Sequence, residues 1–404
     1  MKTSVRLQLM AMMFLQFFVW GAWYGQMSKY LFTQLGATGV QVGSAYAAFS
    51  IAMIISPFFV GMIADRYFAA QKVLGVLNLA GAAMLFLLTQ STNVDTFFWY
   101  ILAYCLTFAP TLALTSSIAM QQMVSSEKEF PAIRVMGTIA WIAVTNLVGY
   151  YALGDNVAIF EIAMYAALVL GVFAFFLPNT PPKPARSTSF ADIVGLDAFK
   201  LFKDRSFTIF FISSVLICIP LSFYYAMANP SLTDSGMTNV ENKMSLGQIS
   251  EVVFMLLIPL AYSRWGVKWM LIVGLLAWIA RFIGFGYGDA ASSEWLLYLA
   301  IVLHGVCYDF FFVTGQIYTD NKAGAKIKSS AQGLISIATY GIGMGIGSWV
   351  AGVVADLYTV DGVKDWTSIW MVPAGIAAVV LVLFVVFFVD NKTKASTVEE
   401  IATA

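Results

Sequence analysis

The chain has 404 residues, of which 22 are basic and 22 are acidic, so its formal net charge is zero. Hydrophobic residues make up 60% of the sequence and charged residues only 11%, and the mean hydropathy is +0.80. A chain with so little polar surface cannot be a soluble globule of this size, so it belongs in a membrane. Basic residues form no tract outside short loops, which argues against a nucleic-acid partner.

Apolar segments of about 20 residues, the length that crosses the hydrocarbon layer as a helix, follow one another along the chain. The first set lies near residues 8–32, 41–63, 70–90, 96–122, 131–152 and 158–177. The second set lies near residues 206–228, 246–263, 268–287, 295–318, 330–355 and 367–389. The sequence therefore predicts an all-α membrane protein with twelve transmembrane helices in two six-helix halves.

The longest connection, 178–205, separates these two sets. It opens with several prolines and continues with apolar residues at helical spacing, namely Phe190, Ile193, Val194, Phe199 and Phe202. Either a short amphipathic helix on the membrane surface or a partly ordered tether fits this pattern. The predicted units are an N-terminal half (1–177), a linker (178–205), a C-terminal half (206–390) and a cytoplasmic tail (391–404).

The basic residues of the connections predict the orientation. Most of them lie in the termini or in loops that follow even-numbered segments, whereas the other loops hold only Lys29, Lys243 and Lys364. Loops rich in Lys and Arg stay on the cytoplasmic side. We therefore expect a multi-pass protein of the cell (inner) membrane with both termini in the cytoplasm.

One carboxylate, Asp309, lies inside the apolar segment 295–318, between Tyr308 and a run of three phenylalanines. An ionised side chain at the centre of a membrane helix costs about 2.5–3.5 kcal/mol even on the lowest scales, so such a residue usually faces a water-filled path or a partner. The alternative is a buried ion pair that only joins helices. Glu251 is a second intramembrane acid, and we favour Asp309 as the proton carrier because it lies deeper in its helix.

Other polar and aromatic residues share helix faces and predict a lined cavity. Residues three, four or seven apart point the same way on a helix. Such stripes come from four predicted helices of both halves, and they comprise Arg134, Thr138 and Trp141, then Ser222 and Tyr225, then Gln248 and Glu251, and finally Tyr308 and Phe312 beside Asp309. A solute with hydroxyl groups and a flat ring would suit them.

Two further ionisable residues lie in apolar segments. His304 precedes Asp309 by five positions, which turns it away from that carboxylate, so we expect a structural hydrogen-bonding role for it. Arg281 has no partner that the sequence identifies, and Glu161 and Glu251 both remain candidates. We find no nucleophile with a base, no metal-ligand cluster and no phosphate-binding loop, so we expect neither an enzyme nor a bound cofactor.

A loop motif and an internal echo indicate the type of fold. The stretch Gly61-Met62-Ile63-Ala64-Asp65-Arg66 resembles the loop between helices two and three of the major facilitator superfamily, and Tyr262-Ser263-Arg264-Trp265 repeats it in outline in the second half. The resemblance implies the fold of that superfamily, with a central site between two related halves. It also implies that Asp65 and Arg66 brace the cytoplasmic gate.

Longer segments resemble one family, the bacterial nucleoside:proton symporters. The resemblance rests on Leu15 to Trp23 (LQFFVWGAW), Phe108 to Thr111 (FAPT), Phe130 to Ile139 (FPAIRVMGTI), Gln248 to Glu251 (QISE) and Tyr308 to Phe311 (YDFF). It implies a nucleoside site that Arg134, Thr138, Trp141, Gln248, Glu251, Tyr308 and Asp309 would line. Ser222 and Tyr225 stand where characterised relatives carry Gln and Asn, so the range of substrates can differ.

The resemblance implies a monomeric carrier that takes up nucleosides with protons by alternating access, with Asp309 or Glu251 binding the proton. A carrier of the same fold for sugars or other small polar solutes, possibly uncoupled, is the alternative hypothesis. A membrane-embedded enzyme or receptor is a remoter one.

Overall fold

The computed structural model describes residues 2–66, 68–123, 126–182 and 196–389, and within these ranges the side chains of all but residues 56–66, 126–128, 196–197, 325–326 and 328–329. The helices before the long connection are α1 (Thr3–Trp23), α2 (Met27–Gln34), α3 (Gly39–Arg66), α4 (Ala70–Thr89), α5 (Val94–Gln121), α6 (Ser126–Tyr150) and α7 (Ala158–Ala174). After it come the 3-10 helix η1 (Leu196–Lys203), α9 (Arg205–Asp234), α10 (Val240–Tyr287), α11 (Glu294–Tyr308), the π-helical η2 (Asp309–Val313), α12 (Thr314–Ser336), the π-helical η3 (Ile337–Gly343), α13 (Met344–Leu357) and α14 (Trp366–Phe387).

All twelve predicted membrane segments are helical in the described part of the chain. Nine helical stretches there are long and apolar enough to cross a membrane, and one of them, α10, has 48 residues. At about 1.5 Å of rise per residue, α10 is roughly twice as long as one crossing needs. Two shorter apolar helices, Gly39–Ile55 and Ala158–Ala174, complete the set. The double length of α10 therefore accounts for the predicted segments 246–263 and 268–287.

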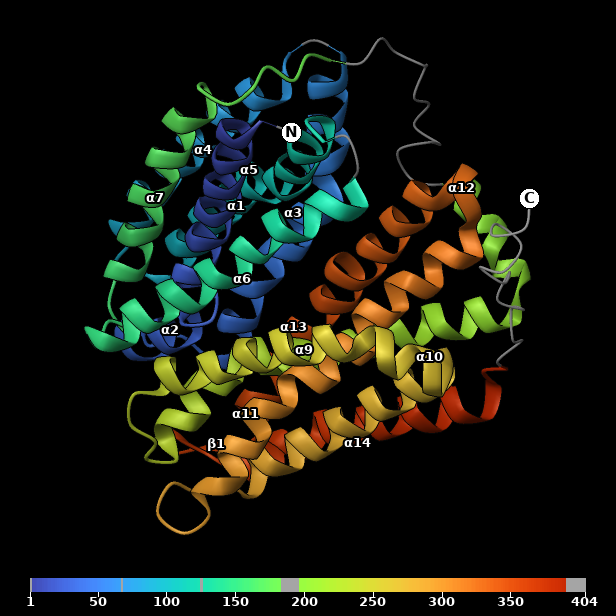
Figure 1. The fold of residues 1–404 in the computed structure, drawn as a ribbon. Helices are drawn as coiled ribbons and strands as arrows, with labels where there is room; N and C mark the ends of the chain where they lie inside the picture. The colour runs from blue at the N-terminus through green and yellow to red at the C-terminus, as the bar shows by residue number, and fades with distance from the viewer. Residues whose placement is uncertain (1, 67, 124–125, 183–195, 390–404) are drawn as a thin grey trace.

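The helices gather into two bundles that follow the order of the chain (Figure 1). In the first bundle α1 packs against α6 and α7, and α5 packs against α3 and α4. In the second bundle α10 packs against α11 and α14, and α9 packs against α13 and α14. The bundles meet mainly where α3 contacts α13 and where α6 contacts α10.

Several helices are interrupted rather than uniform. The α10 helix breaks at Gly266, whose φ of 70° is a left-handed conformation that glycine adopts readily. The predicted segment 295–318 is not one continuous α-helix, because α11 ends at Tyr308 and a π-helical turn begins at Asp309. A second π-helical stretch, η3, interrupts the predicted segment 330–355. Apolar periodicity cannot reveal such turns, because a π-helical turn leaves the segment apolar.

A short hairpin that the sequence analysis did not predict lies between α13 and α14. Strand β1 (Thr359–Val360) pairs antiparallel with β2 (Val363–Lys364), with Thr359 opposite Lys364. The turn is Asp361-Gly362, with φ angles of 51° and 80°. This dipeptide is a strong signal for a two-residue hairpin turn, so the hairpin was predictable from the sequence.

In the described part of the linker, residues 196–203 form a 3-10 helix, whereas residues 178–182 are not helical. Residues 183–195, which include Phe190, Ile193 and Val194, lie outside the described part. In η1, Phe202 packs against the core, whereas Phe199 stays 47% exposed.

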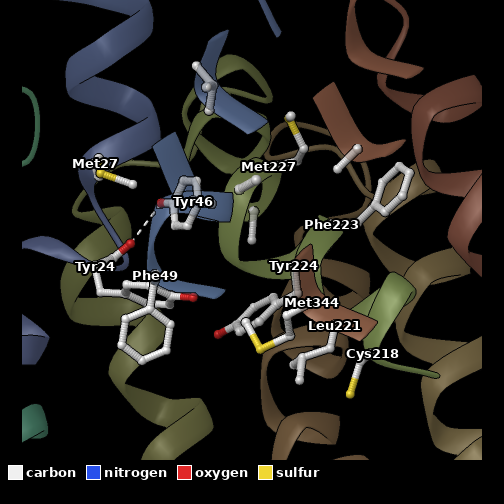
Figure 2. Close-up of a cluster of buried hydrophobic side chains, with 14 of the residues drawn as sticks. Tyr24, Met27, Tyr46, Phe49, Cys218, Leu221, Phe223, Tyr224, Met227 and Met344 are labelled. Carbon is white, nitrogen blue, oxygen red and sulfur yellow. Dashed lines mark hydrogen bonds between the residues drawn. The ribbon is translucent and has the colours of Figure 1, made fainter. Parts of the chain in front are cut away.

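The core crosses from one bundle to the other through aromatic side chains (Figure 2). The hydroxyl of Tyr46 on α3 donates a 2.7 Å hydrogen bond to the backbone carbonyl of Tyr24. The ring of Tyr24 in turn meets the ring of Tyr225 on α9 edge to face, with 5.1 Å between the centroids. Such edge-to-face pairs contribute about 0.5–1.5 kcal/mol beyond their buried area. Aromatic packing thus helps to hold the two bundles together in this conformation.

Asp204 ties the start of α9 to α12. Its carboxylate caps α9 by accepting from Phe207 N at 2.9 Å, and it accepts from Lys322 Nζ at 2.6 Å. Partial burial opposes ionisation, yet the hydrogen bonds from Lys322 and Phe207 win, so the pKa of Asp204 lies below its ordinary value. A depressed pKa means that this stabilisation is present above the ordinary aspartate pKa and is lost as the pH falls through the folded-state pKa.

We therefore predict a pH-dependent effect of Asp204→Asn. Asn still caps the helix, so the substitution removes only the charge, which contributes about 0.2–1 kcal/mol. The melting temperature of the purified protein should fall at pH 7, and the difference from the parent should vanish as the pH drops below about 4. Lys322→Met is the matched variant. Its melting temperature should also lie below that of the parent at pH 7, and this difference should vanish over the same pH range. A difference that stays constant with pH would contradict the prediction.

Candidate functional site

A pocket lies between the two bundles, beside the break between α1 and α2 and the first turns of α10. Trp141 and Thr145 of α6 line it, together with Gly25 and Gln26 from the break between α1 and α2. The second bundle contributes Tyr224 and Tyr225 of α9 and Met244 and Gln248 of α10. Three of these residues, Trp141, Tyr225 and Gln248, are among those predicted from helix-face spacing.

On α6 the predicted stripe faces α1 and the second bundle. The guanidinium of Arg134 lies over the ring of Phe17, 4.2 Å from its centroid. One turn on, Gly137 allows this approach, because a Cβ atom there would lie 2.7 Å from the Phe17 ring. The indole of Trp141 packs edge to face on Trp20, with 5.4 Å between the ring centroids. Thr138 lies between them on the same face, partly exposed.

Arg134 reaches across the boundary between the bundles. Although it is exposed, its charge interacts with Tyr308, Tyr340 and Glu251, all of which belong to the second bundle. An arginine carries five donors in a rigid fork and cannot be deprotonated in proteins, so it supplies a fixed positive charge and several hydrogen bonds. It can therefore bind a polar solute or hold a carboxylate at this boundary.

The structure separates the two predicted residues of α9. Tyr225 lines the pocket. Ser222 is buried, and its hydroxyl donates to the carbonyls of Cys218, at 3.0 Å, and of Met344, at 3.1 Å. Ser222 therefore faces α13 rather than the pocket, and its hydrogen-bonding capacity is used within the protein.

Gln248 and Glu251 are held by a close approach of α10 to α11. Ser250 Oγ accepts a 2.9 Å hydrogen bond from the backbone N–H of Gly305. A Cβ atom at position 305 would lie 2.5 Å from the Ser250 carbonyl carbon, so only glycine fits there. The contact fixes the neighbouring residues Gln248 and Glu251 against the face of α11 that carries His304 and Tyr308.

The aromatic side of the predicted site comes from α11, η2 and η3. Tyr308 Oη lies 2.9 Å from Tyr340 Oη, within hydrogen-bonding distance. Phe312 packs beside Tyr308, with 5.1 Å between the ring centroids. These rings offer the flat apolar surface that the sequence predicted, and Tyr340 was missed.

Asp309 begins the π-helical turn and is fully buried. Neither of its carboxylate oxygens has a hydrogen-bond partner among the residues that the structure describes. Its electrostatic neighbour is Glu251. Single π-helical turns occur often at functional sites, and a buried carboxylate without a partner is costly to keep ionised. Binding a proton would remove that cost.

His304 and Arg281 form a buried pair behind Glu251. Arg281 Nη1 lies 2.7 Å from His304 Nδ1, and His304 Nε2 lies 3.7 Å from Glu251 Oε1. The prediction of a hydrogen-bonding role for His304 is confirmed. Of the two acids considered for Arg281, the structure favours Glu251, since the other, Glu161, is exposed on α7.

Sequence reasoning missed Gln26, Thr145 and Tyr224. Thr145 continues the stripe of Arg134, Thr138 and Trp141 by one more turn, so its place was predictable. In contrast, Gln26 depends on the break between α1 and α2, which apolar periodicity did not reveal. Neither Gln26 Oε1 nor Thr145 Oγ1 has a partner among the described residues, so both can accept from a bound solute. The predicted gate residues Asp65 and Arg66 have side chains outside the described part.

Polar contacts join the bundles at the end opposite the N-terminus, which we call the closed end (Figure 1). Lys29 Nζ of α2 lies 3.1 Å from Glu241 Oε1 of α10. Asn242 donates to the side chain of Asn146 at 2.9 Å. Asp356 of α13 accepts from the backbone N–H groups of Gly39 and Val40 at the start of α3, where the positive end of the helix dipole favours a carboxylate. These contacts join the two bundles on this side of the pocket.

Comparisons with known proteins agree with this architecture. The family model described as "Nucleoside H+ symporter" matches residues 1–393. The Escherichia coli K12 protein named "Putative nucleoside transporter YegT" is 41% identical over 99% of this chain and 97% of its own length. The Escherichia coli K12 xanthosine permease is 34% identical over 96% of each chain. A crystal structure of nucleoside transporter NupG superposes with a TM-score of 0.87 at 32% identity, covering 95% of this chain and 99% of that one.

The fold and the central site define a multi-pass membrane transporter with the twelve-helix fold of the major facilitator superfamily. The chain belongs to the nucleoside H⁺ symporter family. It is a secondary active transporter that couples nucleoside uptake to protons. The alternative of a sugar carrier is not favoured.

The closed end predicts the effect of Lys29→Met. The side chains of Lys29 and Glu241 are 17% and 5% exposed, and removal of one partner of a buried ion pair costs several kcal/mol because the other charge is left unpaired. The equilibrium between closed and open should therefore shift toward open by about tenfold or more. Nitroxide labels at Thr33→Cys and Thr238→Cys, which are exposed at this end on different bundles, should then show a larger population at long distance.

Lys243→Met is the matched control, because Lys243 pairs at 3.0 Å with Glu294 of the same bundle. It should leave the distance distribution unchanged. If Lys29→Met also leaves the distribution unchanged, the ion pair does not help to hold the end shut.

Proposed function

We propose that Asp309 carries the coupling proton and that the surrounding polar and aromatic residues bind the nucleoside. The observation that carries this proposal is the burial of the Asp309 carboxylate without a partner among the described residues, beside Glu251. The proposed binding residues from the first bundle are Arg134, Thr138 and Trp141. Those from the second bundle are Tyr225, Gln248, Glu251, Tyr308 and Phe312, whereas Ser222 faces α13 and is not among the binding residues that we propose.

The chemistry of these groups suits a nucleoside. Trp141, Tyr225 and Phe312 offer flat rings against which a base can pack. Arg134, Thr138 and Gln248 offer donors, and Gln248 and Glu251 offer acceptors, for the hydroxyls of a ribose and the edges of a base. A site with several fixed polar groups discriminates strongly against a solute that leaves them unpaired. Binding of this kind needs no cofactor, and we propose no enzymatic reaction.

The proposed cycle moves two halves, residues 1–177 and 206–390, about the site. The linker, 178–205, joins them, and residues 391–404 form a cytoplasmic tail. A proton on Asp309 would neutralise the site, the nucleoside would bind, and the halves would rock so that the other side opens. Asp65 and Arg66 would brace the gate opposite the closed end. A proton moving inward supplies about 2.3 kcal/mol per 100 mV of membrane potential, which can drive accumulation.

We further propose that the transporter is a monomer in the lipid bilayer of the inner membrane with both termini in the cytoplasm. The distribution of Lys and Arg in the connections supports this orientation. In that orientation the closed end would face outward, and the pocket would open toward the cytoplasm.

The test of the function is uptake by the purified transporter in sealed vesicles. Radiolabelled uridine, adenosine and xanthosine should accumulate under an inward proton gradient, and a protonophore should abolish the accumulation. Maltose and sucrose should neither accumulate nor compete. Accumulation that survives the protonophore would contradict proton coupling, and competition by sugars alone would favour the alternative substrate class.

Arg134→Ala should weaken nucleoside binding. A hydrogen bond to a charged group contributes about 1.5–3 kcal/mol, so loss of one such contact should raise the Kd by roughly 10- to 100-fold. Calorimetric titration of the purified variant measures this change. Arg134→Lys keeps the charge without the forked set of donors, so its Kd should lie between those of Arg134→Ala and the parent. An unchanged Kd in a folded Arg134→Ala protein would assign Arg134 to the gate instead.

Asp309→Asn should uncouple transport from protons. Asn keeps the shape of the side chain but cannot titrate, so the variant should exchange nucleoside across the membrane without accumulating it under a proton gradient. Comparison of counterflow with gradient-driven uptake in the same vesicles measures this difference. If Asp309→Asn still accumulates nucleoside as the parent does, while Glu251→Gln does not, the coupling residue is Glu251.

A further inference from the structure

Arg281 is a fully buried cation in the middle of the second bundle. Its Nε donates a 2.9 Å hydrogen bond to the carbonyl oxygen of Ala300 on α11. Its guanidinium lies over the ring of Tyr224, 3.7 Å from the centroid. The side chain is therefore fixed by a backbone carbonyl and an aromatic face, and neither of these neutralises its charge. A buried charge needs an opposite charge nearby, since it is otherwise very costly.

His304 stands between Arg281 and Glu251. An arginine side chain carries only donors, so the 2.7 Å contact requires His304 Nδ1 to accept the hydrogen bond from Arg281 Nη1. The proton of the neutral ring then lies on Nε2, the nitrogen that points to Glu251. A second ring proton would place an N–H group against the guanidinium. Arg281 thus selects the ring form in which His304 presents a donor to the carboxylate.

The hydrogen bond between His304 and Glu251 is not formed in this conformation. His304 Nε2 lies 3.7 Å from Glu251 Oε1, slightly beyond a hydrogen bond. A rotation of the Glu251 side chain that shortens the gap by less than about 1 Å would complete it. His304 itself is held in place, because its ring packs on Tyr224 with 5.0 Å between centroids and its Cβ and Cδ2 atoms lie close to Gly247, where an added Cβ atom would meet them at 3.3 and 3.4 Å.

We propose that Arg281 and His304 are positioning residues for Glu251. This pair, which we call the relay, holds the Glu251 carboxylate while the carboxylate is ionised. It does so through the Nε2–H donor of His304 and the charge of Arg281 behind it. It releases the side chain toward the pocket when Glu251 is protonated or binds the solute. This inference deepens the proposed function, because it assigns to Glu251 two positions that the transport cycle would use in turn.

Other groups around Glu251 share its electrostatic environment. The charged and titratable side chains that interact with it come from every element packed against it and comprise Arg134 of α6, Tyr224 and Tyr225 of α9, Arg281 of α10, His304, Cys307 and Tyr308 of α11, Asp309 of η2 and Tyr340 of η3. Arg134 is exposed at the boundary between the bundles, whereas Arg281 is buried within one of them. Of these two arginines, therefore, only Arg281 can stay with Glu251 when the halves move apart.

The first test needs no nucleoside, so it can succeed or fail independently of the proposed function. A hydrophobic carbodiimide modifies protonated carboxyl groups, and mass spectrometry reports the extent of modification of Glu251 at each pH. Arg281→Met removes the cation at similar volume. Because a carboxylate that loses a nearby positive charge ionises less readily, modification of Glu251 should persist to higher pH in this variant, by about one pH unit or more.

Three further variants separate the effect of charge from that of volume and position. Arg281→Lys keeps the charge and should keep the parental modification profile. His304→Phe keeps the ring packing but removes the donor, so it should shift the profile as Arg281→Met does, and it serves in its place should Arg281→Met fail to fold. Arg264→Met makes the same chemical change at an exposed arginine and should change nothing. A profile for Glu251 that is the same in His304→Phe, Arg281→Met and the parent would overturn the proposal.

A double-mutant cycle tests whether Arg281 acts through Glu251. In proton-driven nucleoside uptake, Arg281→Met should lower the initial rate at least tenfold in the parent and leave it unchanged in a Glu251→Gln background, since the relay then has no carboxylate to hold. Uptake that falls by the same factor in both backgrounds would show a merely structural role and overturn the proposal. If the parent protein shows no proton-driven nucleoside uptake while the modification profiles are as expected, the proposed function is contradicted and the positioning role is not.

Discussion

The burial of ionisable groups in an otherwise apolar bundle is the constraint on which the rest of this structure depends. Charged residues are only 11% of the chain, yet Arg281, His304 and Asp309 are all buried within the second bundle. Each ionised group there needs a partner, a proton or a bound solute. Arg281 and His304 have found one another, whereas Asp309 has no hydrogen-bond partner among the described residues. The pair of Arg281 and His304 gives the site a fixed charge. The carboxylate of Asp309 gives it a place where a proton can bind and leave.

The contacts between the bundles combine aromatic packing, such as Tyr24 on Tyr225, with polar pairs, whereas apolar packing of long helices dominates within each bundle. At the closed end, the polar contacts include Lys29 with Glu241 and Asp356 with the first turn of α3. Water can take the place of these polar partners when the end opens. Rigid halves whose boundary contacts can be exchanged in this way suit alternating access.

Twelve membrane segments, the division of the helices and the stripe on α6 could be predicted from the sequence, because each depends on local hydrophobicity or on helix periodicity. The partners of Arg281 could not, since His304 is 23 positions away and the contact depends on how α10 packs against α11. Ser222 has the right spacing for a pocket residue, but spacing does not say which neighbour a helix face meets. In the same way, the break that places Gln26 in the pocket interrupts a segment whose apolar pattern continues through it.

Interruptions of the helices lie where the site needs them. In a uniform α-helix every backbone N–H is paired, and side chains follow one another at about 100°. The π-helical turn at Asp309 adds a residue to one turn and so rotates everything after it relative to α11. The five positions between His304 and Asp309 already turn these two side chains apart on an ordinary helix, so His304 faces Glu251 from α11. The π-helical turn acts on the residues that follow Asp309, because its extra residue sets the direction of Phe312 and of the start of α12. Helix spacing therefore separates His304 from the carboxylate that we assign to the proton, and the change in helix type redirects the helix beyond it.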